Sequence, residues 1–211
     1  MHLFSRVATL TGGPIQPIEW AANITAHVNG LMGVELSLWQ GQFGYPLGTV
    51  AWSAVFESRA HLAEETSKLA GDQGFLDLVG QGQEFATTPF TDTLRTVVHS
   101  TSEPGDAPPI GAWAELTTAA PAAGQIGAAR AWGVEIADRY SAVTGTPSVF
   151  LADDYGPFGQ LTWLVAHVDA AAADRANEAV AGDADYVAAI DGGGGRFQPG
   201  SANRSALIRL A

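Results

Sequence analysis

The feature that most constrains the fold of this chain is a short motif that occurs twice. Residues 45–53 read YPLGTVAWS and residues 156–164 read GPFGQLTWL. In both, a proline, an apolar residue and a glycine precede a tryptophan. Three anchors recur at a separation of 111 positions: Pro46 with Pro157, Gly48 with Gly159 and Trp52 with Trp163. Because these uncommon residues recur in the same order, they indicate an internal duplication of about half the chain.

Residues suited to the beginning and the end of a helix recur as well. Ser58 and Asp169 each precede a helix-like stretch, and both residue types can accept a hydrogen bond from an amide at a helix N-terminus. The two stretches end at glycines, Gly71 and Gly182, where a left-handed conformation costs little. Different residues with the same physical role support duplication more strongly than identity alone.

Each half is predicted to run strand, helix, strand, strand, helix, strand. In the first half these are a strand at 3–10, a helix from Pro17 to Leu31, strands at 34–40 and 48–57, a helix at 59–70, a short apolar turn at 75–79 and a strand including 94–98. The second half has a helical pattern from Trp132 to Val143, strands at 146–152 and 160–168, a helix at 170–181 and a strand at 205–210. Residues 100–110 have the composition of a linker. The predicted units are therefore 1–99 and 111–211.

A βαββαβ unit of this size resembles the ferredoxin-like fold. Two such units in tandem resemble the dimeric α/β-barrel superfamily, of the antibiotic-biosynthesis-monooxygenase-like kind, with two protomers fused. The resemblance implies the α+β class and a pseudo-dimeric α/β barrel. That superfamily includes cofactor-independent monooxygenases, haem-degrading enzymes, relatives of haem peroxidases and non-enzymatic ligand-binding proteins. No signature motif of one family occurs in the chain, so the resemblance transfers no catalytic residue. One chain can supply both halves, which allows a monomer or a homodimer.

Charge and cysteine content exclude several kinds of function. The formal net charge is −12 and the pI is about 4.6, so the surface repels nucleic acid and anionic membranes. The chain has no cysteine, which rules out disulfides and thiolate chemistry. Its five histidines do not follow the HxH, HxxxH or HExxH spacings, so no metal site is predicted.

The first residues, MHLFSRVATL, lack the charged and apolar regions of a signal peptide. No apolar run approaches the roughly eighteen residues of a membrane span. We therefore expect a cytoplasmic protein.

The candidate site residues come from the expected cleft between the two sheets. His167 takes the place of Phe56 in the second copy and shares a strand face with Trp163. It is the candidate catalytic group: a general base, a haem ligand or a hydrogen-bond donor to a bound ring. The alternative is a partly solvated histidine at a strand end with no role. Trp52 and Trp163 are candidates for a wall that stacks on a planar ligand, or for core packing.

Three further residues complete the predicted ligand-binding set. Ser53 is replaced by Leu164 in the second copy, and Trp39 has Phe150 as its counterpart. Arg6 is a charge in an otherwise apolar strand, suited either to a ligand carboxylate or to a solvated strand edge. Alternation places Trp52 and Ser53 on opposite faces, and the sequence does not decide which face is inward.

Two functions follow from these observations. In the first, the cleft binds a small apolar or planar ligand, with haem as one candidate, and the protein has oxygenase-like activity. In the second, the protein is a non-catalytic assembly or interaction subunit whose cleft is filled by its own side chains.

Overall fold

The computed structural model describes residues 1–86, 88–103 and 107–211. These residues form eight strands and six helices, so the chain is of the α+β class. In chain order the elements are β1 (His2–Thr9), α1 (Gln16–Leu31), β2 (Ser37–Phe43), β3 (Thr49–Phe56), α2 (Arg59–Ala70), α3 (Gln73–Gly82), β4 (Thr91–Ser100), β5 (Trp113–Ala119), α4 (Ile126–Thr144), β6 (Ser148–Tyr155), β7 (Leu161–His167), α5 (Ala170–Gly182), α6 (Ala184–Asp191) and β8 (Asn203–Arg209).

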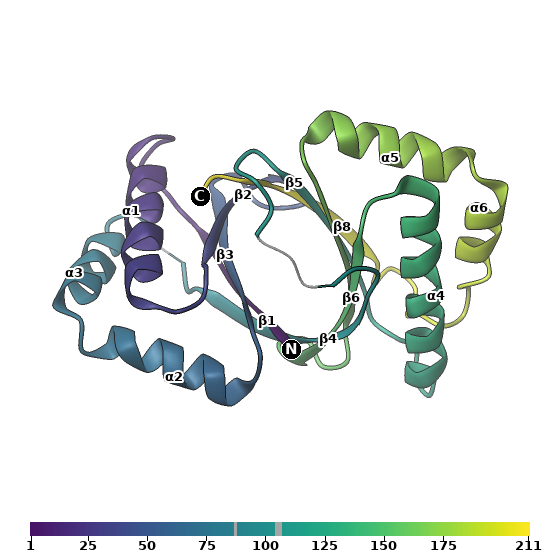
Figure 1. Ribbon diagram of the computed structural model, residues 1–211, viewed down its shortest axis with the longest axis horizontal. Coiled ribbons are helices and arrows are strands. Elements are labelled where there is room, and N and C mark those ends of the chain that lie inside the picture. The colour runs from purple at the N-terminus through teal and green to yellow at the C-terminus, as the bar shows by residue number, and fades with distance from the viewer. Residues whose placement is uncertain (87, 104–106) are drawn as a thin grey trace.

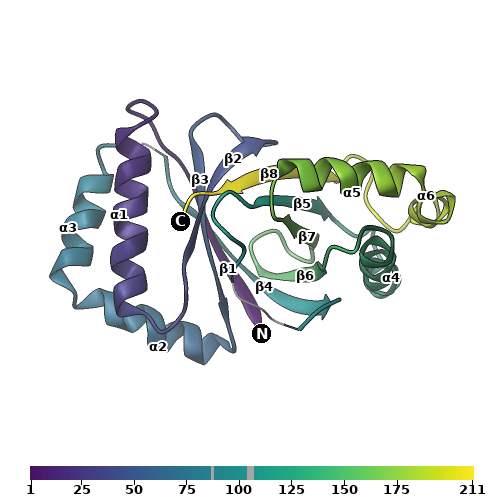
Figure 2. The same cartoon turned by 45° about the horizontal axis from the view of Figure 1, so that its top comes forward.

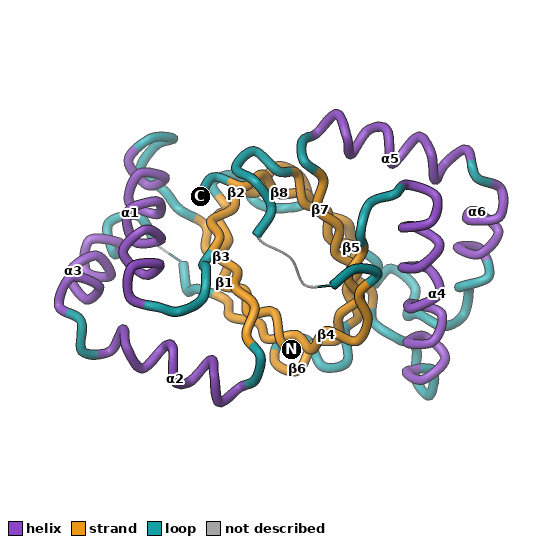
Figure 3. Tube along the Cα trace, viewed as in Figure 1, coloured by secondary structure: helices purple, strands orange, loops and turns teal. Residues whose placement is uncertain are grey.

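The eight strands close into one antiparallel barrel in the order β1-β3-β2-β8-β5-β7-β6-β4 (Figure 3). Each half supplies four neighbouring strands, and the halves are joined by the pairs β2–β8 and β4–β6. Helices α1–α3 lie outside the barrel on one side and α4–α6 on the other (Figures 1 and 2). The predicted α/β barrel is confirmed.

Both halves contain one more helix than the sequence predicted. The expected short turn at 75–79 is part of helix α3, and α6 occupies the corresponding place in the second half. Aspartates begin both helices: Asp72 accepts from the amide of Phe75 and Asp183 from that of Tyr186, each at 2.7 Å. The predicted caps at Ser58 and Asp169 are also present, with bonds from the amides three residues later at 3.1 and 2.7 Å.

Glycines let the extra helices approach the first helix of each half. A Cβ on Gly82 would lie 2.2 Å from the ring of Trp20, and one on Gly193 would lie 2.6 Å from the ring of Trp132. The two indole N–H groups donate to carbonyls near these glycines, at Leu78 and Ala189. The packing of α3 on α1 and of α6 on α4 therefore uses the same contact.

The predicted linker, 100–110, overlaps the end of β4 at Ser100. Part of it, residues 104–106, lies outside the described residues. The boundaries 1–99 and 111–211 stay predictions.

Strand alternation separates two kinds of core. One face of each strand points into the barrel, where Trp39, Ala51, Ala114 and Leu207 form a buried cluster. The other face packs beneath the helices, with Trp52 in the first half and Phe150 in the second. Among the described residues, no helix has the length and hydropathy that a membrane-spanning segment needs.

Candidate functional site

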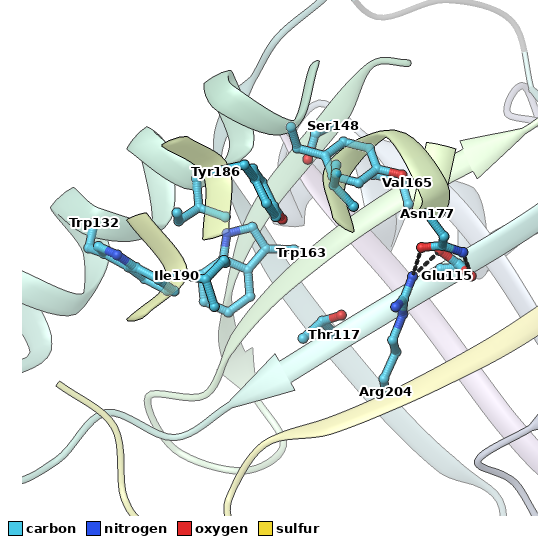
Figure 4. Close-up of a pocket in the computed structure, with 13 residues that line it drawn as sticks. Glu115, Thr117, Trp132, Ser148, Trp163, Val165, Asn177, Tyr186, Ile190 and Arg204 are labelled. Carbon is cyan, nitrogen blue, oxygen red and sulfur yellow. Dashed lines mark hydrogen bonds and ion pairs between the residues drawn. The ribbon is translucent and has the colours of Figure 1, made fainter. Parts of the chain in front are cut away.

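Each half has a pocket between its helices and the outer face of the barrel. The second-half pocket has a volume of about 310 Å³ (Figure 4). Its walls come from strands β5–β8 and helices α4–α6. The lining residues are Glu115, Thr117, Trp132, Ile136, Tyr140, Ser148, Trp163, Val165, Asn177, Val180, Tyr186, Ile190 and Arg204.

Aromatic rings form one wall of the second-half pocket. The rings of Trp132 and Trp163 meet edge to face with centroids 5.6 Å apart. The Trp163 indole N–H donates to the carbonyl of Gly133 at 2.9 Å, which fixes the plane of the ring. Tyr140 and Tyr186 meet in the same way at 6.3 Å. Fixed aromatic rings of this kind suit contact with a flat ligand.

A polar cluster forms another part of the wall. Arg204 Nη2 donates to Glu115 Oε2 at 2.5 Å and to Asn177 Oδ1 at 2.7 Å (Figure 4). Asn177 Nδ2 in turn donates to Glu115 Oε1 at 3.4 Å. The Glu115 side chain is only 10% exposed, whereas that of Arg204 is 53% exposed. The cluster thus places a carboxylate inside the pocket and its counter-charge toward solvent.

His167 lies behind this pocket. Its Nε2 shares a hydrogen bond of 3.3 Å with the hydroxyl of Tyr140 and lies 4.0 Å from Glu115 Oε2. Its Nδ1 is buried and has no hydrogen-bond partner among the residues that the structure describes. The residue is 3% exposed, so the expectation that it is partly solvated is wrong, although it does end strand β7.

Burial favours the neutral forms of three side chains at the site, His167, Tyr140 and Tyr186. It lowers the pKa of His167, an effect that Glu115 opposes and Arg204 reinforces. Burial, with the nearby charge of Glu115, raises the pKa of Tyr140 to about 12. Burial also raises the pKa of Tyr186. At neutral pH the site therefore holds a neutral imidazole and two phenols.

The lowered pKa of His167 predicts a pH-dependent stability. In the unfolded chain His167 binds a proton with a pKa near 6.5. In the folded chain it binds that proton only at lower pH, so the free energy of unfolding falls as the pH drops below 6.5. We expect His167→Phe, which copies Phe56 of the first half, to show a smaller fall in melting temperature between pH 7.5 and pH 5. Thermal unfolding of both proteins across this range measures the difference, and equal falls would contradict the prediction.

The first-half pocket is larger and has fewer polar side chains in its lining. Its volume is about 460 Å³, and it lies between β1, β3, β4 and helices α1–α3. The lining residues are Phe4, Arg6, Trp20, Ile24, Val28, Met32, Leu36, Trp52, Phe56, Leu62, Thr66, Leu69, Phe75, Val79, Phe90 and Asp92. Arg6 donates two hydrogen bonds of 2.7 Å to the carboxylate of Asp92, which raises the pKa of the guanidinium.

The structure does not bring the six predicted site residues together. Trp163 lines the second-half pocket, with His167 behind its lining. Trp52 and Arg6 line the first-half pocket. Trp39 and Ser53 point into the barrel, where the Trp39 indole N–H donates to Ser53 Oγ at 2.9 Å. The reason is alternation, because adjacent residues of one strand face opposite sides.

Sequence reasoning missed the polar members of the second-half pocket. Glu115, Tyr140, Asn177 and Arg204 were not among the candidates. A signal was present in the repeat itself, because the first half has Phe4 where the second has Glu115. A comparison of the halves that looked for apolar-to-polar changes would have found Glu115 and Tyr140. It would not have found Asn177 and Arg204, because their counterparts, Thr66 and Thr93, are also polar.

Haem, the one cofactor considered from sequence, does not fit these residues. No histidine lines either pocket among the described residues. His167 Nε2 is engaged by Tyr140, and the raised pKa values of Tyr140 and Tyr186 keep both phenols protonated and poor ligands for iron. Within residues 1–86, 88–103 and 107–211, no group of three His, Asp or Glu side chains is placed to hold a metal ion.

A closed eight-stranded barrel with three helices outside each half is the dimeric α/β-barrel fold. The fold is similar to that of a proposed monooxygenase from Fusobacterium nucleatum (TM-score 0.76, 10% identity, 100% of this chain and 92% of that chain). It is also similar to an anthrone oxidase-like protein (TM-score 0.70, 12% identity, 100% and 91%). A third similar structure is a proposed monooxygenase from Lactobacillus acidophilus (TM-score 0.62, 12% identity, 99% and 93%). No protein-family model and no curated protein matches the sequence. At these identities the likeness establishes the fold alone.

Proposed function

We propose that the second-half pocket binds a small planar molecule with a hydroxyl or keto group, and that the protein oxidises such a molecule with oxygen. One observation carries the proposal: the pocket sets a buried, hydrogen-bonded carboxylate, Glu115, beside a wall of fixed indole rings, Trp132 and Trp163. The rings suit the flat body of the ligand, and the carboxylate suits a hydroxyl donor.

Proton transfer is assigned to Tyr140 and His167. Tyr140 lines the pocket, and we assign its hydroxyl a hydrogen bond with a ligand oxygen. His167, neutral and bonded to that hydroxyl, orients it and can take up a proton through it. His167 therefore keeps the acid–base role expected from sequence, but acts through Tyr140.

The two halves support the choice of pocket. Corresponding positions carry polar groups in the second half and apolar groups in the first: Glu115 and Phe4, Tyr140 and Val28, His167 and Phe56, Tyr186 and Phe75. We attribute this to duplication of one ferredoxin-like unit, giving 1–99 and 111–211, followed by divergence of the two pockets.

The proposed reaction follows the fold neighbours described as monooxygenases and anthrone oxidase-like. Anthrone has an acidic CH₂ group beside its ketone. Loss of one proton gives an enolate that reacts with O₂, and loss of water then gives anthraquinone. The balance is one anthrone and one O₂ to one anthraquinone and one water. This reaction needs a site for the flat ring, which the indole wall supplies. It also needs a proton acceptor, which Tyr140 and His167 supply.

A substitution at the pocket mouth tests the assignment. Ile190 lines the second-half pocket and is 40% exposed, so Ile190→Trp should obstruct the pocket with little strain. We expect it to weaken binding of 1,8-dihydroxyanthraquinone, followed by quenching of tryptophan fluorescence, by about tenfold or more. It should also lower O₂ uptake with anthrone to the uncatalysed rate.

Val79→Trp is the matched control, because Val79 holds the corresponding place in α3 and lines the other pocket. It should leave both measurements unchanged. Equal losses in the two variants, or none in either, would contradict the proposed site.

A second candidate function rests on the interior of the barrel. Trp39, Ala51, Ala114 and Leu207 pack there against one another, as expected of a cleft filled by its own side chains. A non-catalytic interaction protein would show no O₂ uptake above background in the same assay. One chain closes the barrel, so the monomer is the proposed unit.

A further inference from the structure

We propose that the first-half pocket is a second binding site, specific for a neutral and wholly apolar molecule. It lies among α1, α2, α3 and the outer face of β1, β3 and β4. Figure 1 shows these helices on the opposite side of the barrel from α4–α6, which line the second-half pocket. The proposal concerns different residues and a different class of ligand from the oxidation site, and does not depend on that site.

The lining is apolar where the second-half pocket is polar. Phe4, Val28, Phe56 and Phe75 stand at the positions of Glu115, Tyr140, His167 and Tyr186. These four residues come from two strands and two helices, and each is apolar where its counterpart is polar. Arg6 is an exception, because Thr117 stands at its place in the second half, but its charge is paired with Asp92. A coordinated change of this kind alters the ligand that the pocket selects, because buried polar groups favour ligands that can pair with them.

The polar side chains that remain are already paired within the protein. The indole N–H of Trp20 donates to the carbonyl of Leu78 at 2.8 Å, and that of Trp52 donates to the hydroxyl of Thr25 at 2.9 Å. The hydroxyl of Thr66 donates within its own helix at 2.8 Å. A polar substituent of a ligand placed deep in this pocket would therefore lose its water without gaining a partner.

The two charged side chains that line the pocket form an ion pair with each other. Arg6 and Asp92 form a two-point ion pair, and their side chains are 41% and 47% exposed. The guanidinium lies over the rings of Phe4 and Phe90, at 5.9 and 5.8 Å from the centroids. This pair forms a charged rim beside an apolar interior. Because Nε and Nη2 of Arg6 already donate to the Asp92 carboxylate, an anionic ligand must compete with Asp92 for them.

An apolar ligand also fits the energetics of the cavity. The pocket has a volume of about 460 Å³ and is lined mostly by aromatic rings and aliphatic chains. Atoms of a ligand would add van der Waals contacts to these side chains. Water does not fill such a space well, because it finds few groups to bond. A hydrocarbon or an unsubstituted ring system supplies the missing contacts and releases the cavity walls from water.

A pair of fluorescent probes that differ by one charge tests the proposal. N-phenyl-1-naphthylamine is neutral, and 1-anilinonaphthalene-8-sulfonate is the same molecule with a sulfonate. We expect the neutral probe to bind the wild-type chain at least about tenfold more tightly than the sulfonated probe. Val79→Trp should reduce binding of the neutral probe about tenfold or more, whereas Ile190→Trp should change it less than about twofold.

Two results would overturn the second site. One is binding of the neutral probe that Val79→Trp leaves unchanged. The other is binding of the sulfonated probe that is equally tight and equally sensitive to that variant. Circular dichroism and thermal unfolding establish that the variants fold. If Val79→Trp does not fold, Val79→Phe replaces it as a smaller obstruction of the pocket. It should also weaken binding of the neutral probe.

Discussion

Phe150→Ala is expected to lower the free energy of unfolding by about 3–5 kcal/mol. Phe150 is 0% exposed and belongs to the cluster beneath α4. Its ring lies 5.0 Å from that of Trp163, and a Cβ on Gly133 would fall 2.2 Å from its Cζ. Removal of the ring leaves a cavity under both residues that the surrounding β-strands cannot close.

Chemical denaturation and thermal unfolding measure this loss. For a chain of this length, we expect the melting temperature to fall by about 2–4 °C for each kcal/mol. Phe158→Ala is the control, because Phe158 is 97% exposed in the loop between β6 and β7. It should change stability by no more than about 0.5 kcal/mol. A similar loss in both variants would show that the cluster around Phe150 does not stabilise the second half as described.

The fold was predictable because its signals are local and occur twice. Ser58 and Asp169 were predicted as caps from residue type alone, and both accept the expected bonds. The recurrence of Trp52 as Trp163 matched the two halves to each other, and the spacing of apolar residues predicted the order of elements in each. The extra helices α3 and α6 were missed because each is short, although Asp72 and Asp183 marked where they begin.

The inward face of the strands was not predictable in the same way. Alternation separates Trp52 from Ser53 but is symmetric between the two faces. Contacts with distant residues break that symmetry: the indole of Trp52 donates to Thr25 on α1, whereas Ser53 accepts from Trp39 inside the barrel. These contacts depend on how the helices pack, which no single strand specifies.

The polar cluster could not be predicted from local sequence patterns, for a related reason. Glu115 lies on β5, and Arg204 lies near the start of β8. The antiparallel register between these strands places Arg204 opposite Thr117 and so beside Glu115. Asn177 approaches from α5. Only Glu115 differs from an apolar counterpart in the repeat, Phe4, and the site exists only once the barrel has closed.

Glu115 gives the largest expected effect on ligand binding. We expect Glu115→Gln to weaken binding of 1,8-dihydroxyanthraquinone by about 10- to 100-fold, which corresponds to loss of a hydrogen bond to a charged acceptor, about 1.5–3 kcal/mol. The amide keeps the size of the side chain but accepts a hydroxyl proton less strongly than the carboxylate. It also removes the counter-charge of Arg204 and leaves the guanidinium with its hydrogen bond to Asn177.

The control for this effect is Glu135→Gln. Glu135 also pairs with an arginine, Arg139, but that pair lies on the exposed face of α4 with side chains 51% and 44% exposed. Its removal should leave binding within about twofold and stability within about 1 kcal/mol. Fluorescence titrations of the three proteins at pH 7.5 make the comparison. If Glu115→Gln binds the probe as tightly as the wild type, the carboxylate does not contact the ligand, and the aromatic wall alone holds it.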